Sequence, residues 1–514
     1  MSHTSNRSGG MSKQKPERKR EAQAKVGRVV PSAPREATNA PTSPISANAP
    51  GALGTARPAN ELPAGSAAKT ALGIVRRLQG VGFAAFWVGG CVRDFLLGRE
   101  PGDYDIVTSA LPEQIEHLFR RTIPVGRKFG VIVVVEDGRQ FQVATFRAEG
   151  DYQDGRHPER VAFGDAEADA RRRDFTVNGL FYDPVRKELH DWVGGEADLR
   201  ARIIRTIGSP SERFAEDHLR LLRAVRFAAQ LDFSIEAGTF AALQANAGKI
   251  KTISAERVRE ELVKLFSPPH APRGLDLLRE SGLLAEVMPE IAATTTCEQS
   301  PDFHPEGNVF NHLRLMLQHL PPNPDASLPW AVLLHDVAKP VTASVDPKTG
   351  STHFYGHEKV GADMAADMLG RLRFPRKQID EVVAAVRCHM QFKDAPQMRK
   401  STLRRLLMRP TFPLELELHR LDCVGSHGRL DVYDYLLAQA QELAQQPQIR
   451  PPLLTGDDLI ALGLKPGPAM GALLAEIREK QLQDELKTKA EARKWAKQRI
   501  ARNPAKPSEN LAKP

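Results

Sequence analysis

The stretch Gly89–Ser109, GGCVRDFLLGREPGDYDIVTS, decides which fold the chain is predicted to adopt. It follows the apolar run Phe83–Val88, which is typical of a buried strand, and its paired glycines lead into a short helical pattern. Such a turn lets a phosphate approach the backbone, and the N–H groups at the start of the helix are free to bind it. Asp103 and Asp105 lie two positions apart at the start of a second predicted strand, Tyr104–Thr108, so both carboxylates project to one face. Two adjacent carboxylates are hard oxygen ligands of the kind that Mg²⁺ requires when it bridges nucleotide phosphates.

The chain around this stretch alternates between helical and strand patterns. Leu72–Leu78 predicts a helix, and so does Val92–Leu97 directly after the glycines. Val131–Val135 and Phe141–Phe146 read as strands, and polar and apolar residues alternate along the second. These patterns predict an α/β head over residues 67–208.

The remainder of the chain is predicted to be helical. The amphipathic stretch Glu212–Gln230 predicts one long helix, and Ser254 is typical of the residue that begins another. We predict a helical neck over residues 209–295, a helical domain over residues 296–445 and a helical tail over residues 446–514. The fold class is therefore α+β, with an α/β head followed by helical domains.

Length and composition exclude several classes of protein. At 514 residues the chain exceeds what one core supports, so two to four domains are expected. Four widely spaced cysteines without a CxxC pair exclude a disulfide framework and a cysteine zinc site. No run approaches the ~18 apolar residues of a membrane span, so no membrane partner is expected. The lack of an apolar signal segment predicts a cytoplasmic protein, and mitochondrial targeting is the weaker alternative because the basic N-terminus carries Glu17 and Glu21.

The net charge of +9 is concentrated at the two ends of the chain. Residues 1–66 carry +6 and residues 479–514 carry +5, which leaves −2 for residues 67–478. The first segment is rich in Pro and Ala and lacks apolar periodicity, so we predict a disordered basic tail. Because the middle of the chain is nearly neutral, a polyanionic partner must be recognised by local sites.

Gly89–Ser109 resembles motif A of the nucleotidyltransferase superfamily that includes polymerase beta, in its class II branch of tRNA CCA-adding enzymes and bacterial poly(A) polymerases. Arg172–Asn178, RRDFTVN, resembles motif B of that branch, and Glu216–Phe227, EDHLRLLRAVRF, resembles motif D. The resemblance implies a polymerase-beta-like head, an RNA-binding neck, and Mg²⁺ held by the catalytic Asp103 and Asp105. It also implies a set of nucleotide-binding residues, namely Gly89, Gly90, Arg93, Arg173, Asp174, Asp217, Arg220, Arg223 and Arg226.

The residue types in these motifs suit nucleotide binding. An arginine can grip a phosphate with two parallel hydrogen bonds, and a carboxylate can accept one from a ribose hydroxyl. Asp217 and Arg220 together offer an acceptor and donors to the edge of an incoming base. The alternative for this pair is a plain (i, i+3) ion pair on a helix. Many relatives carry Glu where this sequence has Gln142, so we expect Asp103 and Asp105 to act without a third carboxylate.

Histidines and aspartates recur along the helices predicted for residues 296–445. Imidazole and carboxylate groups from separate helices can converge on divalent ions. Their order resembles the HD metal-dependent phosphohydrolase domain, which implies a transition metal such as Ni²⁺, Mn²⁺ or Fe²⁺. HD domains also persist as binding scaffolds without hydrolytic activity. The implied ligands are His312, His335, Asp336 and Asp422, with His357 and His389 for a second ion.

Finer features favour CCA addition over poly(A) addition. Gly130–Val134 and Gly150–Pro158 resemble segments of CCA-adding enzymes that carry an HD domain, and Thr455–Leu459 with Gly463–Pro468 resembles their tail. The resemblance therefore implies an enzyme that adds C, C and A to the 3′ end of tRNA from CTP and ATP, with no DNA partner. Poly(A) polymerase and enzymes that add only CC or only the final A stay as alternatives. A hypothesis of a different class is an HD phosphohydrolase whose degenerate head only binds RNA.

Overall fold

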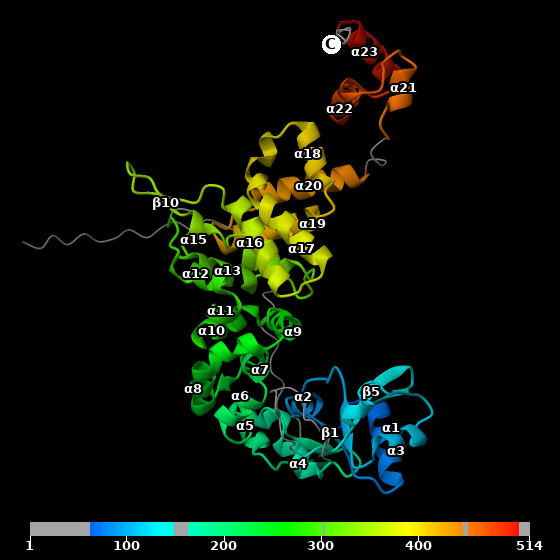
Figure 1. The fold of residues 1–514 in the computed structure, drawn as a ribbon, viewed down its shortest axis with the longest axis vertical. Helices are drawn as coiled ribbons and strands as arrows, with labels where there is room; N and C mark the ends of the chain where they lie inside the picture. The colour runs from blue at the N-terminus through cyan, green and yellow to red at the C-terminus, as the bar shows by residue number, and fades with distance from the viewer. Residues whose placement is uncertain (1–61, 149–162, 302–303, 446–450, 503–514) are drawn as a thin grey trace, which may run out of the picture. The chain divides into compact units, whose positions relative to one another are not determined.

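The computed structural model contains a mixed sheet followed by a long series of helices, as predicted for an α+β protein (Figure 1). It describes residues 62–148, 163–301, 304–445 and 451–502. The predicted N-terminal tail, apart from residues 62–66, and the segment Gly150–Pro158 lie outside the described residues. None of the helices found among the described residues is long and apolar enough to cross a membrane.

The head contains a seven-stranded sheet with the order β3-β4-β5-β2-β1-β6-β7. β2 and β5 are parallel, with Ile106 opposite Val143, and the other neighbouring strands are antiparallel. The three strands expected from Tyr104, Val131 and Phe141 onward are confirmed to within one or two residues. The strands are β1 (Ala85–Val88), β2 (Asp105–Thr108), β3 (Thr122–Ile123), β4 (Val131–Glu136), β5 (Arg139–Thr145), β6 (Phe181–Asp183) and β7 (Glu188–His190).

Alternate side chains of β2 belong to two different layers. Ile106 is part of the core that includes α1 (Ser66–Gly80) and α3 (Pro112–Leu118). Val107 packs on the other face, with Ala170 of α4 (Ala166–Arg171). Asp105 precedes Val107 by two positions and therefore faces the same side as α4. The sheet thus keeps its hydrophobic support on the α1 face and leaves the first carboxylate of β2 on the α4 face.

The single helix expected over Glu212–Gln230 is wrong, because the structure contains two helices, α6 (Pro210–Glu216) and α7 (Leu219–Leu231). Asp217 between them has an extended backbone, with φ −150° and ψ 103°. Its Oδ1 atom accepts a hydrogen bond from the backbone N–H of Leu219 at 3.0 Å. An aspartate that bonds a nearby backbone N–H offers the chain an alternative to a continuous helix. The amphipathic pattern continues through the break, so the pattern alone did not reveal it.

The remaining elements are helical apart from two small strand pairs. α9 begins directly after Ser254, as predicted, and the last three helices have a core of their own. The divisions at residues 208, 295 and 445 stay a prediction. The helices are α2 (Gly90–Leu96), α5 (Gly195–Ala201), α8 (Ala237–Asn246), α9 (Ala255–Leu265), α10 (Ala271–Glu280), α11 (Leu283–Val287), α12 (Pro289–Ala293), α13 (Val309–Gln318), α14 (Leu328–Leu334), α15 (Lys339–Thr342), α16 (His357–Arg371), α17 (Arg376–Cys388), α18 (Lys400–Leu407), α19 (Phe412–Gly425), α20 (Asp431–Gln445), α21 (Gly456–Ile460), α22 (Pro468–Leu482) and α23 (Lys489–Arg502).

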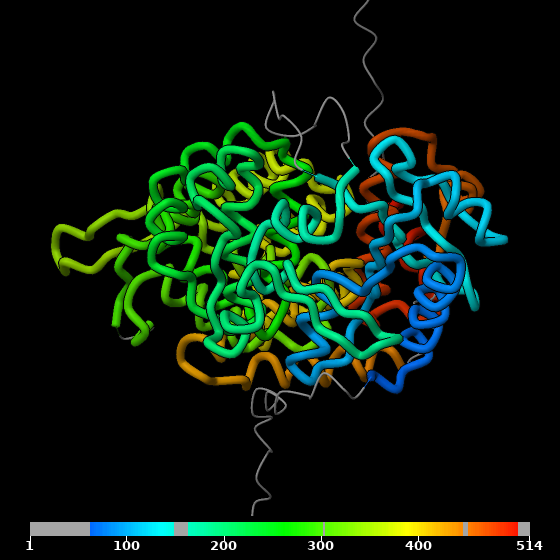
Figure 2. The backbone as a smooth tube through the Cα atoms, turned by 90° about the horizontal axis from the view of Figure 1, so that it is seen from below, coloured from blue at the N-terminus to red at the C-terminus, as the bar shows by residue number. Residues whose placement is uncertain are grey.

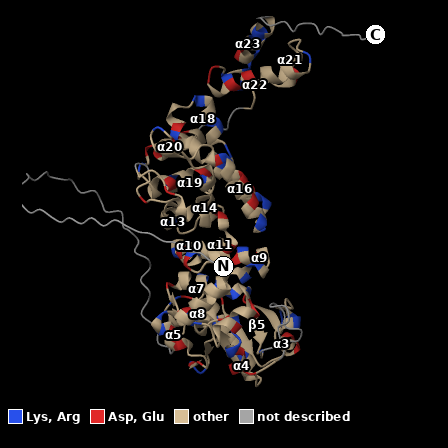
Figure 3. Cartoon of the chain, turned by 60° about the vertical axis from the view of Figure 1, so that its left-hand side comes forward, with Lys and Arg blue, Asp and Glu red and all other residues tan. Residues whose placement is uncertain are grey.

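Two features of the surface stand out in the views of the chain. The hairpin of β10 (Ser344–Val345) and β11 (Thr352–His353) extends away from the helices near it (Figures 1 and 2). Basic and acidic residues are interspersed along the described ribbon (Figure 3). This mixture agrees with the near-zero net charge of residues 67–478 and directs attention to local clusters of charge.

Replacing Gly195 with alanine should destabilise the head. A Cβ atom at this first residue of α5 would overlap the carbonyl oxygen of Thr176, in the 3₁₀ turn Thr176–Asn178. We expect Gly195→Ala to lower the free energy of unfolding by about 1–3 kcal/mol, the usual cost of overpacking. Gly73→Ala is the control, because an added Cβ in the middle of α1 meets no atom within 4 Å. It should stabilise by up to about 1 kcal/mol. Urea titration measures both, and equal shifts would contradict this account.

Candidate nucleotide site and candidate metal centre

A cavity of about 360 Å³ lies against the sheet of the head. Its walls come from β2, β4 and β5, from the residues just after α4, and from the break between α6 and α7. Segments that are far apart in the sequence therefore meet here. The charged residues that line it are five arginines and three aspartates, namely Arg147, Arg172, Arg173, Arg220, Arg223, Asp105, Asp174 and Asp217.

The two candidate metal-binding carboxylates lie at the start of β2. Asp105 is the first residue of the strand and lines the cavity, whereas Asp103 precedes the strand and is not part of the cavity wall. Burial raises the pKa of Asp105, and the nearby charge of Asp103 raises it further. A cation beside the two carboxylates would stabilise the charged form of Asp105 that burial disfavours. The pair therefore fits a divalent ion on the cavity side of the sheet.

Gln142 occupies the position where many relatives carry a glutamate. β5 runs parallel to β2, with Ile106 opposite Val143, and one residue earlier Asp105 and Gln142 both line the cavity. The backbone thus brings this third position to the cavity, but an uncharged amide stands there. The site holds two carboxylates at β2 and no third one from β5.

The glycine turn lies beside one of the cavity arginines. Gly89 has φ +70°, a left-handed conformation that glycine adopts without strain, and Gly90 begins α2. A Cβ added to Gly89 would be 3.2 Å from Nη1 of Arg173. Arg93 lies outside the cavity wall, where its Nη1 atom donates a hydrogen bond to Oδ1 of Asn178 at 2.9 Å. The structure therefore places Gly89 beside the site, while Arg93 joins α2 to the 3₁₀ turn at the end of Arg172–Asn178.

Asp174 and Arg223 form an ion pair within the cavity wall. Nε and Nη2 of Arg223 donate to Oδ2 of Asp174 at 2.9 and 2.6 Å, and Asn178 donates to Oδ1 at 3.2 Å. Burial opposes ionisation of Asp174, but Arg223 and Asn178 hold its pKa below the usual value. The carboxylate is thus ionised, and the pair joins motif B to α7.

Asp217 and Arg220 do not pair with each other in the described chain. Oδ2 of Asp217 accepts from Nη2 of Arg257 at 2.7 Å, and Nη1 of Arg220 donates to Oε2 of Glu216 at 2.6 Å. The (i, i+3) ion pair considered from the sequence is absent, because Asp217 lies outside α7 in an extended conformation. Each side chain is held by a different partner, and both border the cavity.

Arg226 is not placed where it could bind a triphosphate. Its side chain is 9% exposed, it lies outside the cavity wall, and its Nε atom donates to Oε2 of Glu261 at 2.5 Å. The sequence spacing placed it one helical turn beyond Arg223, but α7 directs it against α9. Arg226 is therefore a buried structural charge among the described residues.

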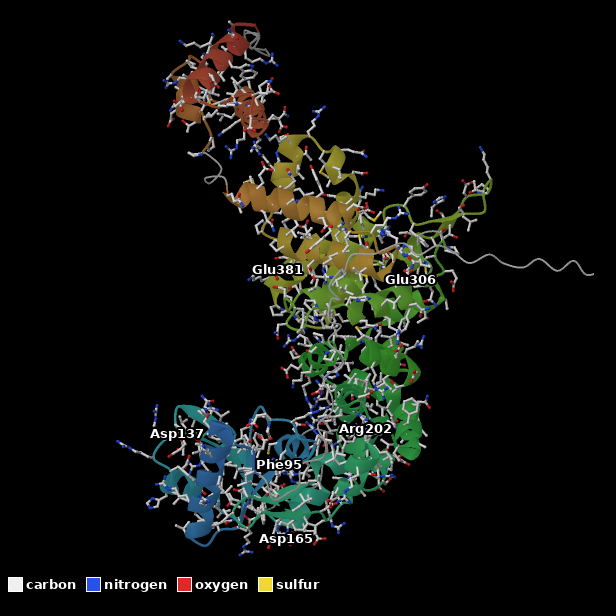
Figure 4. All side chains as sticks on the ribbon, turned by 180° about the vertical axis from the view of Figure 1, so that it is seen from behind. Phe95, Asp137, Asp165, Arg202, Glu306 and Glu381 are labelled. Atoms are coloured by element: carbon white, nitrogen blue, oxygen red, sulfur yellow. The ribbon has the colours of Figure 1, made fainter. Side chains whose placement is uncertain are left out.

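A second cluster brings together four histidines of residues 296–445, namely His312, His335, His357 and His389. Backbone carbonyls bind the Nδ1 atoms of three of these histidines. The pairs are His335 with Val332 at 2.9 Å, His357 with Phe354 at 2.8 Å, and His389 with Val386 at 2.7 Å. Nδ1 of His312 is held by Oε1 of Glu306 at 2.8 Å (Glu306 is labelled in Figure 4). Because a carbonyl only accepts, each Nδ1 that meets one must carry the proton. Each Nε2 atom is then left with a lone pair for a metal.

These Nε2 atoms converge on two carboxylates. Nε2 of His335 is 3.2 Å from Oδ2 of Asp336, and Nε2 of His312 is 3.2 Å from Oδ1 of Asp422. Both nitrogens nevertheless lack a hydrogen-bond partner with good geometry among the described residues. The remaining pair, Nε2 of His357 and Nε2 of His389, face each other at 3.1 Å.

The cluster fits a divalent cation. Two lone pairs that face each other at 3.1 Å repel unless a proton or a cation lies between them, and burial lowers the pKa of His389 to about 4, an effect that His335 increases. Three overlapping groups have ligand atoms within 4.8 Å of one another: His304 with Glu306 and His312, His312 with His335 and Asp336, and Asp336 with His357 and His389. The donor set of imidazoles and carboxylates suits a transition metal.

Several site residues were missed by the sequence analysis. Glu306 orients His312, Lys339 contacts Oδ2 of Asp336 at 2.7 Å, and Arg257 holds Asp217. Glu306 and Lys339 lie within a few residues of predicted ligands, so their polar character next to those ligands was the available signal. Arg257 lies on a different helix from Asp217, and no local pattern links the two.

The cavity with its paired aspartates and five arginines, together with the histidine cluster on separate helices, defines a nucleotidyltransferase head joined to an HD domain. Residues 85–205 match the Poly A polymerase head domain, residues 232–294 match the probable RNA and SrmB-binding site of polymerase A, and residues 307–424 match the HD domain. The A-adding tRNA nucleotidyltransferase of Deinococcus radiodurans is 35% identical over 80% of this chain and 95% of its own length. The chain belongs to the tRNA nucleotidyltransferase family.

Other relatives match over shorter or more divergent stretches. The CCA-adding enzyme of Geobacillus kaustophilus is 47% identical over 43% of this chain and 55% of its own length, so the chain spans about half of such curated relatives. The crystal structure of the Bacillus stearothermophilus CCA-adding enzyme in complex with CTP has a TM-score of 0.67 and 28% identity. It covers 85% of this chain and 99% of that chain. A Thermotoga maritima CCA-adding enzyme complexed with tRNA shares the fold, with a TM-score of 0.53, 17% identity, and 84% of this chain and 95% of that chain covered.

Replacing Asp336 with alanine should abolish transition-metal binding by the HD cluster. Asp336 contributes to two of the three candidate ligand groups, and removing even an outer partner of a metal ligand typically costs about 10–100-fold in affinity. Titration calorimetry with Ni²⁺ or Mn²⁺, in excess Mg²⁺, measures the loss. The control is His353→Ala, because His353 stacks on Tyr355 in the hairpin and belongs to none of the ligand groups. Equal affinities in the wild type and Asp336→Ala would show that Asp336 is not a metal ligand, and no binding by the wild type would show that the cluster holds no transition metal.

Proposed function

We propose that this protein adds C, C and A to the 3′ end of tRNA, using CTP and ATP and no nucleic-acid template. The observation that carries the proposal is the placement of Asp105 in the wall of a cavity lined by five arginines, with Asp103 two positions earlier, just before the same strand. Carboxylates hold the divalent ion that accompanies a nucleoside triphosphate, and arginines bind its phosphates.

Asp103 and Asp105 are the residues that would hold Mg²⁺. When bound, the ion would polarise the attacking 3′-hydroxyl and stabilise the charge that develops on the α-phosphate and the leaving pyrophosphate. Gln142 can offer an amide oxygen beside them but no charge. The protein's own contribution is to keep the two carboxylates close together at the start of a strand whose other face is packed.

Arg173 and Arg223 are the residues best placed to bind the phosphates. Nη1 of Arg173 lies beside the Gly89 turn, where backbone N–H groups at the start of α2 are available to the same anion. Arg223 borders the cavity while it pairs with Asp174, so the guanidinium has a fixed orientation. A fixed donor loses little entropy when the triphosphate binds.

Asp217 and Arg220 are proposed to read the base. The break between α6 and α7 puts the two side chains at the cavity, and separate partners keep each from collapsing onto the other. Together they present an acceptor and donors, which can match the Watson–Crick edges of both C and A. A protein that selects nucleotides without a template needs such a rigid edge.

The substrates are supported by the relatives and structures described above, which include CCA-adding enzymes with CTP and with tRNA. A second candidate is addition of the terminal A alone, because a relative that aligns over 80% of this chain is an A-adding enzyme. The direct test incubates the protein with Mg²⁺, labelled CTP and ATP, and tRNA ending either before CCA or after CC. Incorporation of both C and A supports the proposal, and incorporation of A alone supports the second candidate. If neither nucleotide is incorporated, both candidates are contradicted.

Replacing either Asp103 or Asp105 with alanine should abolish nucleotide addition. A lone carboxylate holds the ion weakly, so the rate should fall at least about 10³-fold, the scale of losing a principal transition-state stabiliser. Initial rates of CMP incorporation measure the effect. Asp137→Asn is the control, because this carboxylate pairs with Thr70 in the head and lies outside the cavity wall. Substantial activity of either alanine variant would defeat the assignment.

Replacing Asp217 with alanine should weaken the discrimination between nucleotides. Each lost contact to a base edge is worth about 1–3 kcal/mol in nucleic-acid recognition, which corresponds to roughly 5- to 150-fold in selectivity. Competition between CTP and UTP, and between ATP and GTP, gives the ratio, and tRNA affinity should stay near the wild-type value. The control is Glu236→Gln, because Glu236 is a charged cap on α8 outside the cavity wall. Unchanged selectivity would reduce Asp217 to a structural partner of Arg257.

We further propose that the HD cluster prefers a transition metal such as Mn²⁺, Ni²⁺ or Fe²⁺ and acts separately from the head. Its imidazoles come from α13 to α17 and none of them borders the nucleotide cavity. The variant Asp336→Ala is therefore expected to add nucleotides like the wild type, even though it loses metal. Hydrolysis of phosphate esters by the wild type, and its absence in the variant, would identify the cluster as a second active site.

A further inference from the structure

One buried carboxylate lies behind the arginines of the nucleotide cavity. Asp169 is on α4, which begins after the capping residue Asp165 (Figure 4), and its side chain is 0% exposed. Its Oδ1 atom accepts hydrogen bonds from Nε and Nη2 of Arg172 at 2.9 and 2.5 Å. Its Oδ2 atom accepts from Nε and Nη2 of Arg173 at 3.3 and 3.0 Å. Asp169 also anchors a third segment, since Oδ1 accepts the backbone N–H of Arg147 at 3.1 Å.

All three of these arginines line the cavity, but Asp169 does not. The carboxylate binds each of two guanidinium groups by the same edge, formed by Nε and Nη2. The Nη1 atoms of Arg172 and Arg173 have no hydrogen-bond partner among the described residues. For Arg173 that atom lies beside the Gly89 turn. Asp169 therefore binds the Nε and Nη2 atoms of each guanidinium group and leaves Nη1 available to a ligand.

Charge balance explains why this carboxylate stays ionised without contact to water. Burial opposes ionisation, but Arg173 and Arg172 together hold the pKa of Asp169 below the usual value. Removing one partner from a buried ion pair leaves an uncompensated charge, which proteins tolerate poorly. Two arginines that share one carboxylate carry a net positive charge, and a polyphosphate can compensate it from the cavity side.

We infer that Asp169 is a positioning residue of the nucleotidyl-transfer site, which orients Arg172 and Arg173 toward the triphosphate and holds the backbone of Arg147 beside them. The inference rests on the function proposed above. Asp169 touches no reacting atom and acts through the arginines. Correct alignment of the triphosphate matters because a displacement of about 1 Å from the reactive geometry can cost about 10²-fold in rate.

The variant Asp169→Glu tests this placement while it keeps the buried charge. The added methylene shifts both guanidinium groups, so kcat for CMP and AMP addition should fall about 10- to 100-fold. Asp169→Asn is the companion variant. It loses orientation but raises the net positive charge of the cavity, so KM for CTP should stay within a few-fold of the wild type while kcat falls. If Asp169 has only a structural role, both variants should lose thermal stability while kcat of the folded fraction stays unchanged.

The matched control is Glu167→Gln. Glu167 lies on the same helix and bonds Arg171, which is exposed and does not line the cavity. The chemical change is the same as in Asp169→Asn, namely carboxylate to amide, and kcat should stay within about twofold of the wild type. If Glu167→Gln loses as much activity as Asp169→Asn, the effect belongs to α4 in general and the inference is overturned.

A readout that needs no turnover separates this inference from the proposed function. In the wild type the Nε–H groups of Arg172 and Arg173 should exchange slowly with solvent, as measured by NMR on arginine side chains. The Asp169→Asn variant should lose this protection and Glu167→Gln should keep it. The wild type could show slow exchange that changes when CTP binds and still add no nucleotide to tRNA. That result would contradict the proposed function and leave the inference about Asp169 standing. Wild-type kcat in folded Asp169→Glu, or unchanged exchange in Asp169→Asn, overturns the inference.

Discussion

Burying positive charge beside a nucleotide cavity is the constraint on which the head of this protein depends. An arginine taken out of water costs several kcal/mol unless a carboxylate compensates it, and the cavity wall contains five arginines. The structure supplies the compensation both from behind the wall and within it. Asp169 serves Arg172 and Arg173, Asp174 serves Arg223, and Glu216 serves Arg220. The ion pairs also connect α4, the segment after it, and α6 with α7, so the charge balance and the shape of the site are maintained by the same contacts.

In the HD domain the histidine rings are oriented mainly by backbone carbonyls and not by ion pairs. Most of its candidate ligands are imidazoles, so the requirement is to present the correct ring nitrogen. Backbone carbonyls bind Nδ1 of His335, His357 and His389, which leaves Nε2 of each ring directed at the cluster. The carbonyl belongs in each case to the residue three positions earlier, so the local backbone itself sets the tautomer. His312 uses a side chain, Glu306, for this purpose.

The two sites therefore differ in what a mutation can do to them. In the head, one carboxylate often serves more than one guanidinium, and a change at Asp169 reaches two cavity residues at once. In the HD cluster each ring is oriented by its own acceptor, so a change at one histidine leaves the orientation of the others intact. Asp336 is the exception, because its two oxygens lie near His335, Lys339, His357 and His389.

The amino-acid sequence by itself determined the α/β head, the strand that begins at Asp105 just after Asp103, and the candidate ligands of the HD cluster, because these depend on local periodicity or on the order of recognisable residues along the chain. Only the tertiary structure decided which charges meet. The motif spacing grouped Arg226 with Arg223, but the packing of α7 against α9 pairs it with Glu261. Asp217 carried no sign of a helix break, and its partner Arg257 lies 40 residues further along the chain. Asp169 looked like any helical carboxylate until folding buried it between two arginines. Ion pairs between distant segments leave no periodic signal in a sequence, since they depend on how helices and sheet come together.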